Sequence, residues 1–190
     1  MAISLILASQ SPRRRELLQQ LGIQFSVVPS AFEEQMGTRF APGTLVEQNA
    51  LGKSLDVQKK YPNALILGAD TIVVINGNVV GKPIDQEDAV KMLQSMEGRH
   101  HTVHTGVALL EKDRWCVRSR VTRVLMRPLT EAQIRAYVAT GEPMDKAGSY
   151  AIQGIGSTFV DAIEGCYTNV VGLSLPLLFD MLKEFDRVLF

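Results

Sequence analysis

An apolar run interrupted by one carboxylate constrains this chain more than any other feature. Residues 65–74 read Leu-Ile-Leu-Gly-Ala-Asp-Thr-Ile-Val-Val, with Asp70 near the centre. Such a run of aliphatic and β-branched side chains predicts a strand that is buried on both faces. A carboxylate in that setting costs several kcal/mol unless a cation or a hydrogen-bond donor meets it. We therefore expect distant residues to reach Asp70, with a bond to a neighbouring backbone turn as the alternative.

Length and composition limit the classes of protein that fit. The 190 residues, 46% hydrophobic and 21% charged, predict one globular domain over residues 1–190 with room for two lobes. Twenty basic and twenty acidic residues cancel, so no net field favours nucleic acid or a membrane surface. No apolar run reaches the roughly 20 residues that cross a bilayer, and the first residues do not resemble a signal peptide. We expect a cytoplasmic protein whose two cysteines are free thiols rather than a disulfide.

Helix and strand signals alternate along the chain and predict an α/β fold. Strands are expected at residues 3–8, 25–28, 65–75, 78–81, 107–110 and 115–126, and helices at 12–22, 44–60, 85–98, 130–141 and 174–185. Asn76-Gly77 is typical of a type I′ hairpin turn, which would return Lys82 toward Asp70. Histidines at 100, 101 and 104 invite a zinc site, but strand alternation sends the middle one to the opposite face.

The second segment carries an unusual cluster of cations. Ser11 is suited to cap a helix and Pro12 to begin it, yet Arg13, Arg14 and Arg15 follow in the first turn. That end of a helix is positive, so acidic residues would be the stabilising choice. Free backbone N–H groups, serines and clustered arginines together indicate an anion site, most readily for phosphate. A solvated basic patch is the alternative.

Two further features carry possible chemistry. Lys53 interrupts an apolar helical stripe that includes Ala50 and Val57, so it either extends to solvent or reaches into a cleft. We expect this helix to begin at Thr44, with a capping box to Glu47. Gln153 lies in a glycine-rich segment, and its amide offers the paired donor and acceptor that suit the edge of a nucleobase.

Four motifs carry a family resemblance. They are Leu-Ala-Ser-Gln-Ser-Pro-Arg-Arg at 7–14, Gly-Ala-Asp-Thr at 68–71, Gly-Lys-Pro at 81–83 and Asp-Lys-Ala-Gly-Ser-Tyr-Ala-Ile-Gln-Gly at 145–154. The chain resembles the Maf family of nucleoside triphosphate pyrophosphatases, and its Ile-Gln-Gly segment is similar to the branch acting on dTTP and UTP. The resemblance implies a mixed, elongated, twisted sheet flanked by helices, with two lobes around a deep cleft as in ITPase-like proteins. It also implies a divalent metal (Mg²⁺ or Mn²⁺), a homodimer and a cytoplasmic location.

The resemblance and the needs of phosphate chemistry assign roles to the candidate residues. The expected catalytic residues are Asp70, Glu34, Lys53 and Lys82; the expected substrate-binding residues are Ser9, Ser11, Arg13, Arg14, Thr71 and Gln153; and the expected metal ligands are Glu34 and Asp70. Cations would hold the triphosphate, and Asp70 would also accept a proton from water.

Alternative functions remain open at this point. A nucleotide-sensing regulator of cell division would need the basic cluster but neither Asp70 nor Glu34. A 7-methyl-GTP pyrophosphatase would keep the same chemistry with a different base pocket. Gln153 by itself is compatible with uracil, thymine and cytosine, because its amide can present either orientation.

Overall fold

The computed structural model describes residues 5–37 and 39–187, and within them one mixed sheet of seven strands. The sheet order is β2-β1-β3-β5-β6-β7, with β4 paired to β3. β1 runs parallel to β2 and β3, and the other pairs are antiparallel. The strands are β1 Leu5–Leu7, β2 Phe25–Val27, β3 Leu65–Ile75, β4 Asn78–Val80, β5 His100–Glu111, β6 Arg114–Met126 and β7 Val160–Glu164. The mixed α/β prediction is confirmed.

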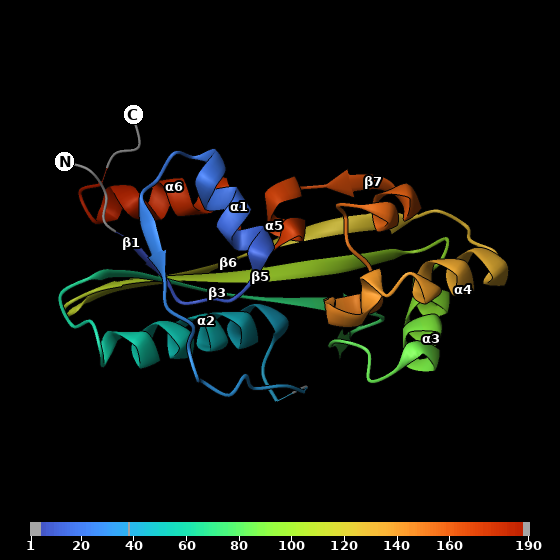
Figure 1. Cartoon of the computed structure of the whole chain (residues 1–190), viewed down its shortest axis with the longest axis horizontal. Coiled ribbons are helices and arrows are strands. Elements are labelled where there is room, and N and C mark those ends of the chain that lie inside the picture. The colour runs from blue at the N-terminus through green and yellow to red at the C-terminus, as the bar shows by residue number, and fades with distance from the viewer. Residues whose placement is uncertain (1–4, 38, 188–190) are drawn as a thin grey trace.

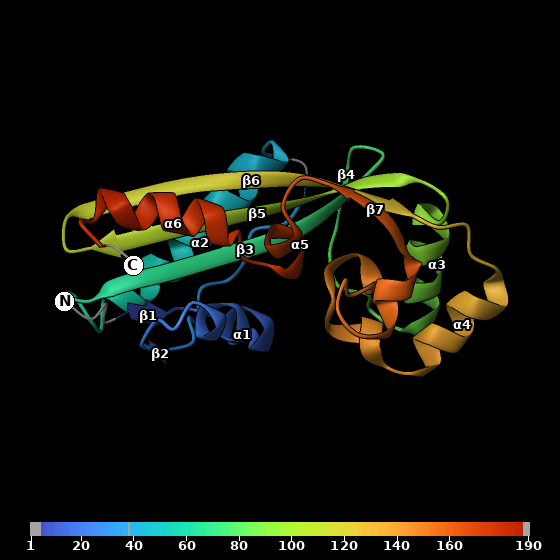
Figure 2. The same cartoon turned by 90° about the horizontal axis from the view of Figure 1, so that it is seen from above.

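Helices gather at the two ends of this elongated sheet. They are α1 Pro12–Gln20, α2 Pro42–Gln58, α3 Gln86–Met96, α4 Glu131–Ala139, α5 Tyr167–Val171 and α6 Leu175–Glu184, with short 3₁₀ turns at Glu142–Asp145 (η1), Ala147–Ser149 (η2) and Ile155–Phe159 (η3). Figure 1 shows α2 beneath the long strands and α1 and α6 above them, while α3 and α4 lie at the far end. Seen from above in Figure 2, the long strands join the two groups.

β3 forms the buried centre that its sequence predicts. Ten of its 11 residues are buried, and Asp70 is only 4% exposed. Asp70 pairs with Gly106 of β5, and a Cβ at Gly106 would lie 2.2 Å from the carbonyl oxygen of Val46. A Cβ at Gly68 would lie equally close, at 2.2 Å, to the carbonyl oxygen of Ala50. The glycines therefore let the backbone of α2 lie directly on the sheet.

Local start signals are mostly confirmed, with two differences. Ser11 caps α1, Asp85 caps α3, and Thr130 forms a full capping box. The prediction for α2 is wrong: the helix begins at Pro42, whose ring favours a first helical position, and no side chain caps it.

The second difference concerns β5. This strand begins at His100 rather than near 107, because the histidine-threonine segment alternates between buried and more exposed residues. Cys116 and Cys166 are free thiols, as expected.

Candidate active site

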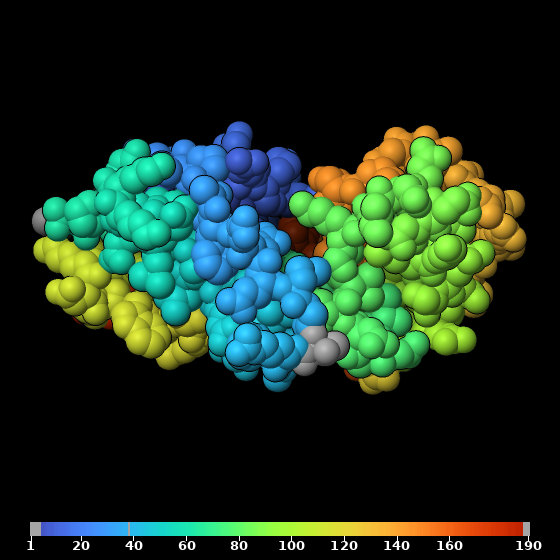
Figure 3. All heavy atoms as spheres, turned by 90° about the horizontal axis from the view of Figure 1, so that it is seen from below, coloured from blue at the N-terminus to red at the C-terminus, as the bar shows by residue number. Residues whose placement is uncertain are grey.

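A pocket of about 350 Å³ lies between the two groups of helices. Its walls come from the turn before α1, the middle of β3 and the segment from η1 to Gln153. Figure 3 shows a hollow here, between the blue N-terminal segments and the green and orange end of the molecule. The pocket collects eight of the predicted site residues: Ser9, Ser11, Arg13, Arg14, Asp70, Thr71, Lys82 and Gln153. It also includes Asp145, Lys146 and Tyr150, which belong to the motif at 145–154 but were not among the expected site residues.

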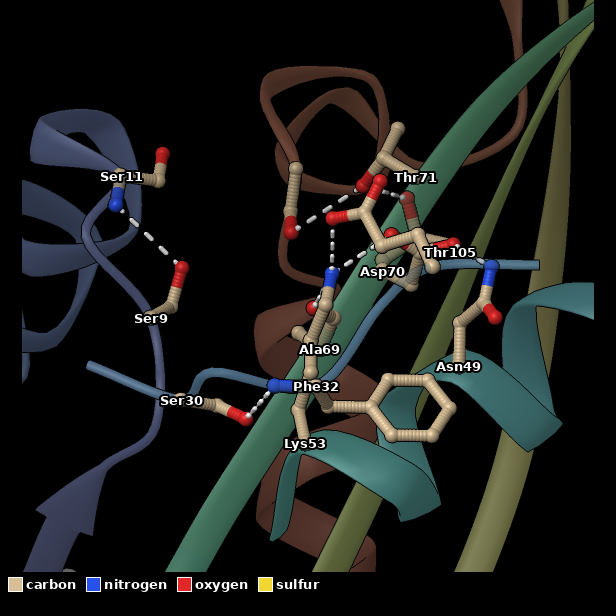
Figure 4. A network of polar contacts seen from close by, with 12 residues as sticks. Ser9, Ser11, Ser30, Phe32, Asn49, Lys53, Ala69, Asp70, Thr71 and Thr105 are labelled. Carbon is tan, nitrogen blue, oxygen red and sulfur yellow. Dashed lines mark hydrogen bonds and ion pairs between the residues drawn. The ribbon is translucent and has the colours of Figure 1, made fainter. Parts of the chain in front are cut away.

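Distant partners meet Asp70, as expected for a buried carboxylate. Lys53 Nζ lies 2.7 Å from Asp70 Oδ1 and 2.6 Å from Glu34 Oε1. Asn49 Nδ2 donates to Asp70 Oδ2 at 2.9 Å. Figure 4 shows Lys53 and Asn49 reaching Asp70 from α2. Glu34 and Lys53 contribute no wall to the pocket, so the structure places them beside it, joined to it through Asp70.

Asn49 is the member of this group that sequence reasoning missed. It is fully buried in α2, one helical turn before Lys53. A polar residue at a buried helical position was the available signal, because such an amide needs partners inside the protein. We call Glu34, Asn49, Lys53 and Asp70 the carboxylate corner.

The three arginines of α1 have three different environments. Arg14 is buried: its Nε donates to the Gly172 carbonyl at 2.8 Å, and its Nη atoms donate to Ser9 Oγ and Thr71 Oγ1, each at 3.0 Å. Burial lowers the pKa of Arg14 below its ordinary value, while the nearby carboxylates of the corner oppose that shift. Arg14 is thus a cation fixed in the pocket wall rather than a mobile side chain.

Arg13 and Arg15 complete this contrast. The guanidinium of Arg13 lies 3.9 Å from the carboxylate of Asp145, on the other side of the pocket. Arg15 is exposed and does not line the pocket. The solvated-patch interpretation therefore describes Arg15, whereas its two neighbours face the pocket.

The segment that carries Gln153 is held by one carboxylate. Glu142 accepts hydrogen bonds from the N–H groups of Ile155 at 3.0 Å and Gly156 at 2.9 Å. Tyr137 donates its hydroxyl to Glu142 at 2.9 Å and accepts from the N–H of Ala151 at 3.3 Å. Burial alone would raise the pKa of Glu142, but these donors outweigh it and lower the pKa. We call residues 151–156 the base loop; its two anchors gave no signal in the sequence.

Tyr150 ties the pocket wall to the sheet. Its hydroxyl lies 2.6 Å from Nε2 of His101 on β5, and the two rings meet edge to face. Burial lowers the pKa of His101 to about 4, so the imidazole is neutral at neutral pH. This histidine therefore supports the pocket as a packed, uncharged residue.

Comparisons with known proteins show the family of this chain. The model of the Maf family (Maf-like protein) matches residues 4–185. A dTTP/UTP pyrophosphatase of Gloeobacter violaceus is 61% identical over the full length of both chains. A nucleoside triphosphate pyrophosphatase of Trichormus variabilis is 44% identical over 95% of this chain and 93% of its own. A solved HAM1 protein from Coxiella burnetii has a TM-score of 0.48 and 20% identity, covering 65% of this chain and 73% of that one. The match over nearly the whole chain shows that this protein belongs to the family of Maf-like proteins.

Proposed function

We propose that this protein hydrolyses dTTP and UTP between the α and β phosphates, releasing the monophosphate and pyrophosphate. The observation that carries this proposal is one pocket in which Arg13, Lys82 and Asp70 meet Gln153. Cations suit a triphosphate, a carboxylate suits water activation, and an amide suits a base edge. The relatives named dTTP/UTP pyrophosphatase, which reach 61% identity, support the same reaction.

The cations in and beside the pocket have separate roles in the proposed reaction. Arg13 and Lys82 lie in the wall and bind phosphate oxygens, with a stronger grip as negative charge develops there. Arg14 orders the turn at Ser9 and Ser11, and adds a fixed positive charge to the same wall. Lys53 contacts both carboxylates and keeps them together when no substrate is present.

The carboxylate corner has a donor set that fits a divalent cation. Mg²⁺ is commonly held by one or two carboxylates, with the remaining ligands from water and substrate phosphates. Glu34 contacts Lys53, and Asp70 contacts Lys53 and Asn49, so each carboxylate keeps further oxygen lone pairs for a cation. We propose that these two residues hold Mg²⁺ or Mn²⁺, which when bound would neutralise charge on the phosphates.

Residues that line the pocket also account for proton transfer and for recognition of the nucleobase. Asp70 is the carboxylate of the corner that lines the pocket, so we assign to it the acceptance of a proton from the attacking water. Gln153 is half-buried in the base loop and pairs with the O4 and N3–H edge of uracil or thymine. Acceptance of both bases requires little discrimination at the 5-methyl group, which is worth only about 1–3 kcal/mol in a pocket.

The assembly and location of the protein are further parts of the proposal. The sheet runs through both ends of the molecule, which supports a single domain of two lobes over residues 1–190. Homodimer formation and a cytoplasmic location rest on the family resemblance. Among the described residues, no helix has the length and apolar character to span a membrane. Light scattering of the purified protein measures the oligomeric state directly, and a monomer at micromolar concentration would contradict the dimer.

The experiment that tests the function is pyrophosphate release from a nucleotide panel with Mg²⁺. We expect dTTP and UTP to be the preferred substrates and nucleoside monophosphate to appear in equal amount. A chain that binds UTP without releasing pyrophosphate would instead be a nucleotide sensor. Preference for 7-methyl-GTP over UTP in direct competition would contradict the substrate assignment while leaving the chemistry intact.

A further inference from the structure

The loop before α2 is fastened along one face of that helix. Asp56 accepts hydrogen bonds from the Ala31 N–H at 2.8 Å and from Ser30 Oγ at 3.1 Å. The ring of Phe32 lies against Gly52, where a Cβ would be 2.4 Å from the ring. Helix positions three or four residues apart share a face, so the contacts at positions 56 and 52 lie on one face of α2 together with position 49. The contacts on this face end beside Glu34.

Asn49 makes the last of these loop-to-helix contacts and also bonds to Asp70. Its Oδ1 accepts from the Gln35 N–H at 2.8 Å, and its Nδ2 donates to the Gln35 carbonyl at 3.0 Å and to Asp70 Oδ2 at 2.9 Å. The residue is 0% exposed. One amide therefore uses both donors and its acceptor to join the backbone next to Glu34 with the carboxylate of Asp70.

We propose that Asn49 is a positioning residue that fixes the two carboxylates of the corner relative to each other. Lys53 attracts both carboxylates, but an ammonium group is a rotatable point charge that tolerates many orientations. The amide of Asn49 restricts the orientation of both groups, because it bonds to the backbone N–H and carbonyl of Gln35 and also donates to Asp70. Asn49 lines no wall of the pocket, so it acts through its neighbours. The kinetic consequence rests on the proposed function; the structural one does not.

Hydrogen exchange tests the structural part in protein free of metal and nucleotide. Asn49→Ala is expected to speed exchange of the Gln35 amide, which otherwise donates to a buried oxygen, while amides of β5 keep their protection. Ser54→Ala is the matched control, because Ser54 is also 0% exposed in α2 but bonds to the Ala108 carbonyl. Unchanged exchange at Gln35 in Asn49→Ala, or an equal rise in Ser54→Ala, overturns the proposal.

Steady-state kinetics with UTP test the catalytic part. Asn49→Ala is expected to lower kcat by about 10- to 100-fold, the usual cost of losing a residue that orients a catalytic ligand. KM should stay within about twofold, since the phosphate-binding and base-binding walls are untouched. Ser54→Ala should keep both parameters. A normal kcat in Asn49→Ala, or a rise in KM with kcat unchanged, overturns the positioning role.

A second variant approaches the same bond from the loop. Gln35→Pro removes the N–H that donates to Asn49 at a position whose side chain is exposed; because proline also restricts the preceding Glu34, the result is compared with that of Asn49→Ala. We expect a fall in kcat in the same direction as for Asn49→Ala; wild-type kcat would overturn the proposal. If the wild type releases no pyrophosphate from any nucleotide, the proposed function fails, and hydrogen exchange alone decides the role of Asn49.

Discussion

The carboxylate corner, which reaches the pocket through Asp70, and the base loop, which lines the same pocket, are built in opposite ways. In the corner, Asp70 on β3 and Lys53 on α2 are buried, the more exposed Glu34 reaches Lys53 from the loop, and each charge meets an opposite charge or an amide. In the base loop, a carboxylate at the edge of the fold accepts backbone N–H groups and so shapes an irregular segment. Rigid elements hold reacting groups to tight tolerance, whereas loops tolerate changes in specificity. We therefore propose that the corner carries the chemistry and the base loop the choice of substrate.

The largest expected effect breaks the corner. Asp70→Asn keeps the size of the side chain but removes the charge that faces the pocket. We expect turnover of UTP to fall at least about 100-fold, the lower range for loss of a general base. Lys53 retains its ion pair with Glu34, so circular dichroism should show a folded chain. Near-normal turnover would remove Asp70 from the mechanism.

The next effect changes substrate choice without changing chemistry. Gln153→Glu sets a carboxylate against the O4 oxygen of uracil and thymine, so it should penalise UTP relative to CTP. One well-formed pair of hydrogen bonds to a base edge is worth about 1–3 kcal/mol, so we expect the UTP-to-CTP ratio of kcat/KM to fall about 10- to 100-fold. Competition between the two nucleotides measures this ratio. An unchanged ratio would show that another residue selects the base.

A smaller effect is expected when Glu142, which anchors the base loop, is substituted. Glu142→Gln keeps the shape of the side chain but replaces one acceptor oxygen with a donor, which cannot satisfy both Ile155 and Gly156. We expect KM for UTP to rise about tenfold, equivalent to about 1.4 kcal/mol, with a lesser change in kcat. A kcat loss as large as that of Asp70→Asn would contradict the division between the two sides.

The smallest effect is expected at Arg15, which lies just outside the pocket, and comparison with Arg13 tests where the site ends. Arg15→Ala should alter kcat/KM by no more than about twofold, as for an exposed substitution remote from the site. Arg13→Ala should cost about tenfold or more, because a charge-assisted bond to phosphate is worth about 1.5–3 kcal/mol. Parallel titrations at two salt concentrations compare the variants. Equal losses in both would favour a diffuse basic surface over positioned ligands.

Sequence reasoning succeeded where a local pattern has one physical solution. The apolar run around Asp70 predicts a buried strand, Ser11-Pro12 predicts a helix start, and Asn76-Gly77 predicts the hairpin between β3 and β4. Lys53 was ambiguous, because a lysine on an apolar face either extends to solvent or finds a carboxylate. The fold resolves this by packing α2 against β3.

The remaining site residues depend on partners that no local pattern encodes, although the helical position of Asn49 was itself a signal. Asn49 finds its partners in a loop and in a strand, which only the tertiary fold brings together. Glu142 binds the backbone of the base loop, and a backbone N–H has no signature in the sequence. The start of α2 was misplaced because Thr44 and Glu47 form a plausible cap, whereas Pro42 begins the helix two residues earlier.

The two sheet glycines that face α2 make the geometry of the carboxylate corner depend on the spacing between the sheet and this helix. Gly68 and Gly106 leave no room for even a methyl group between the sheet and the helix backbone. A lysine has a fixed maximum length, so the separation of these two layers determines whether Lys53 touches Asp70 at all. The methyl group of an alanine at either glycine would push α2 away from the sheet. Activity would then be lost through distance alone, with every charged residue of the site still present.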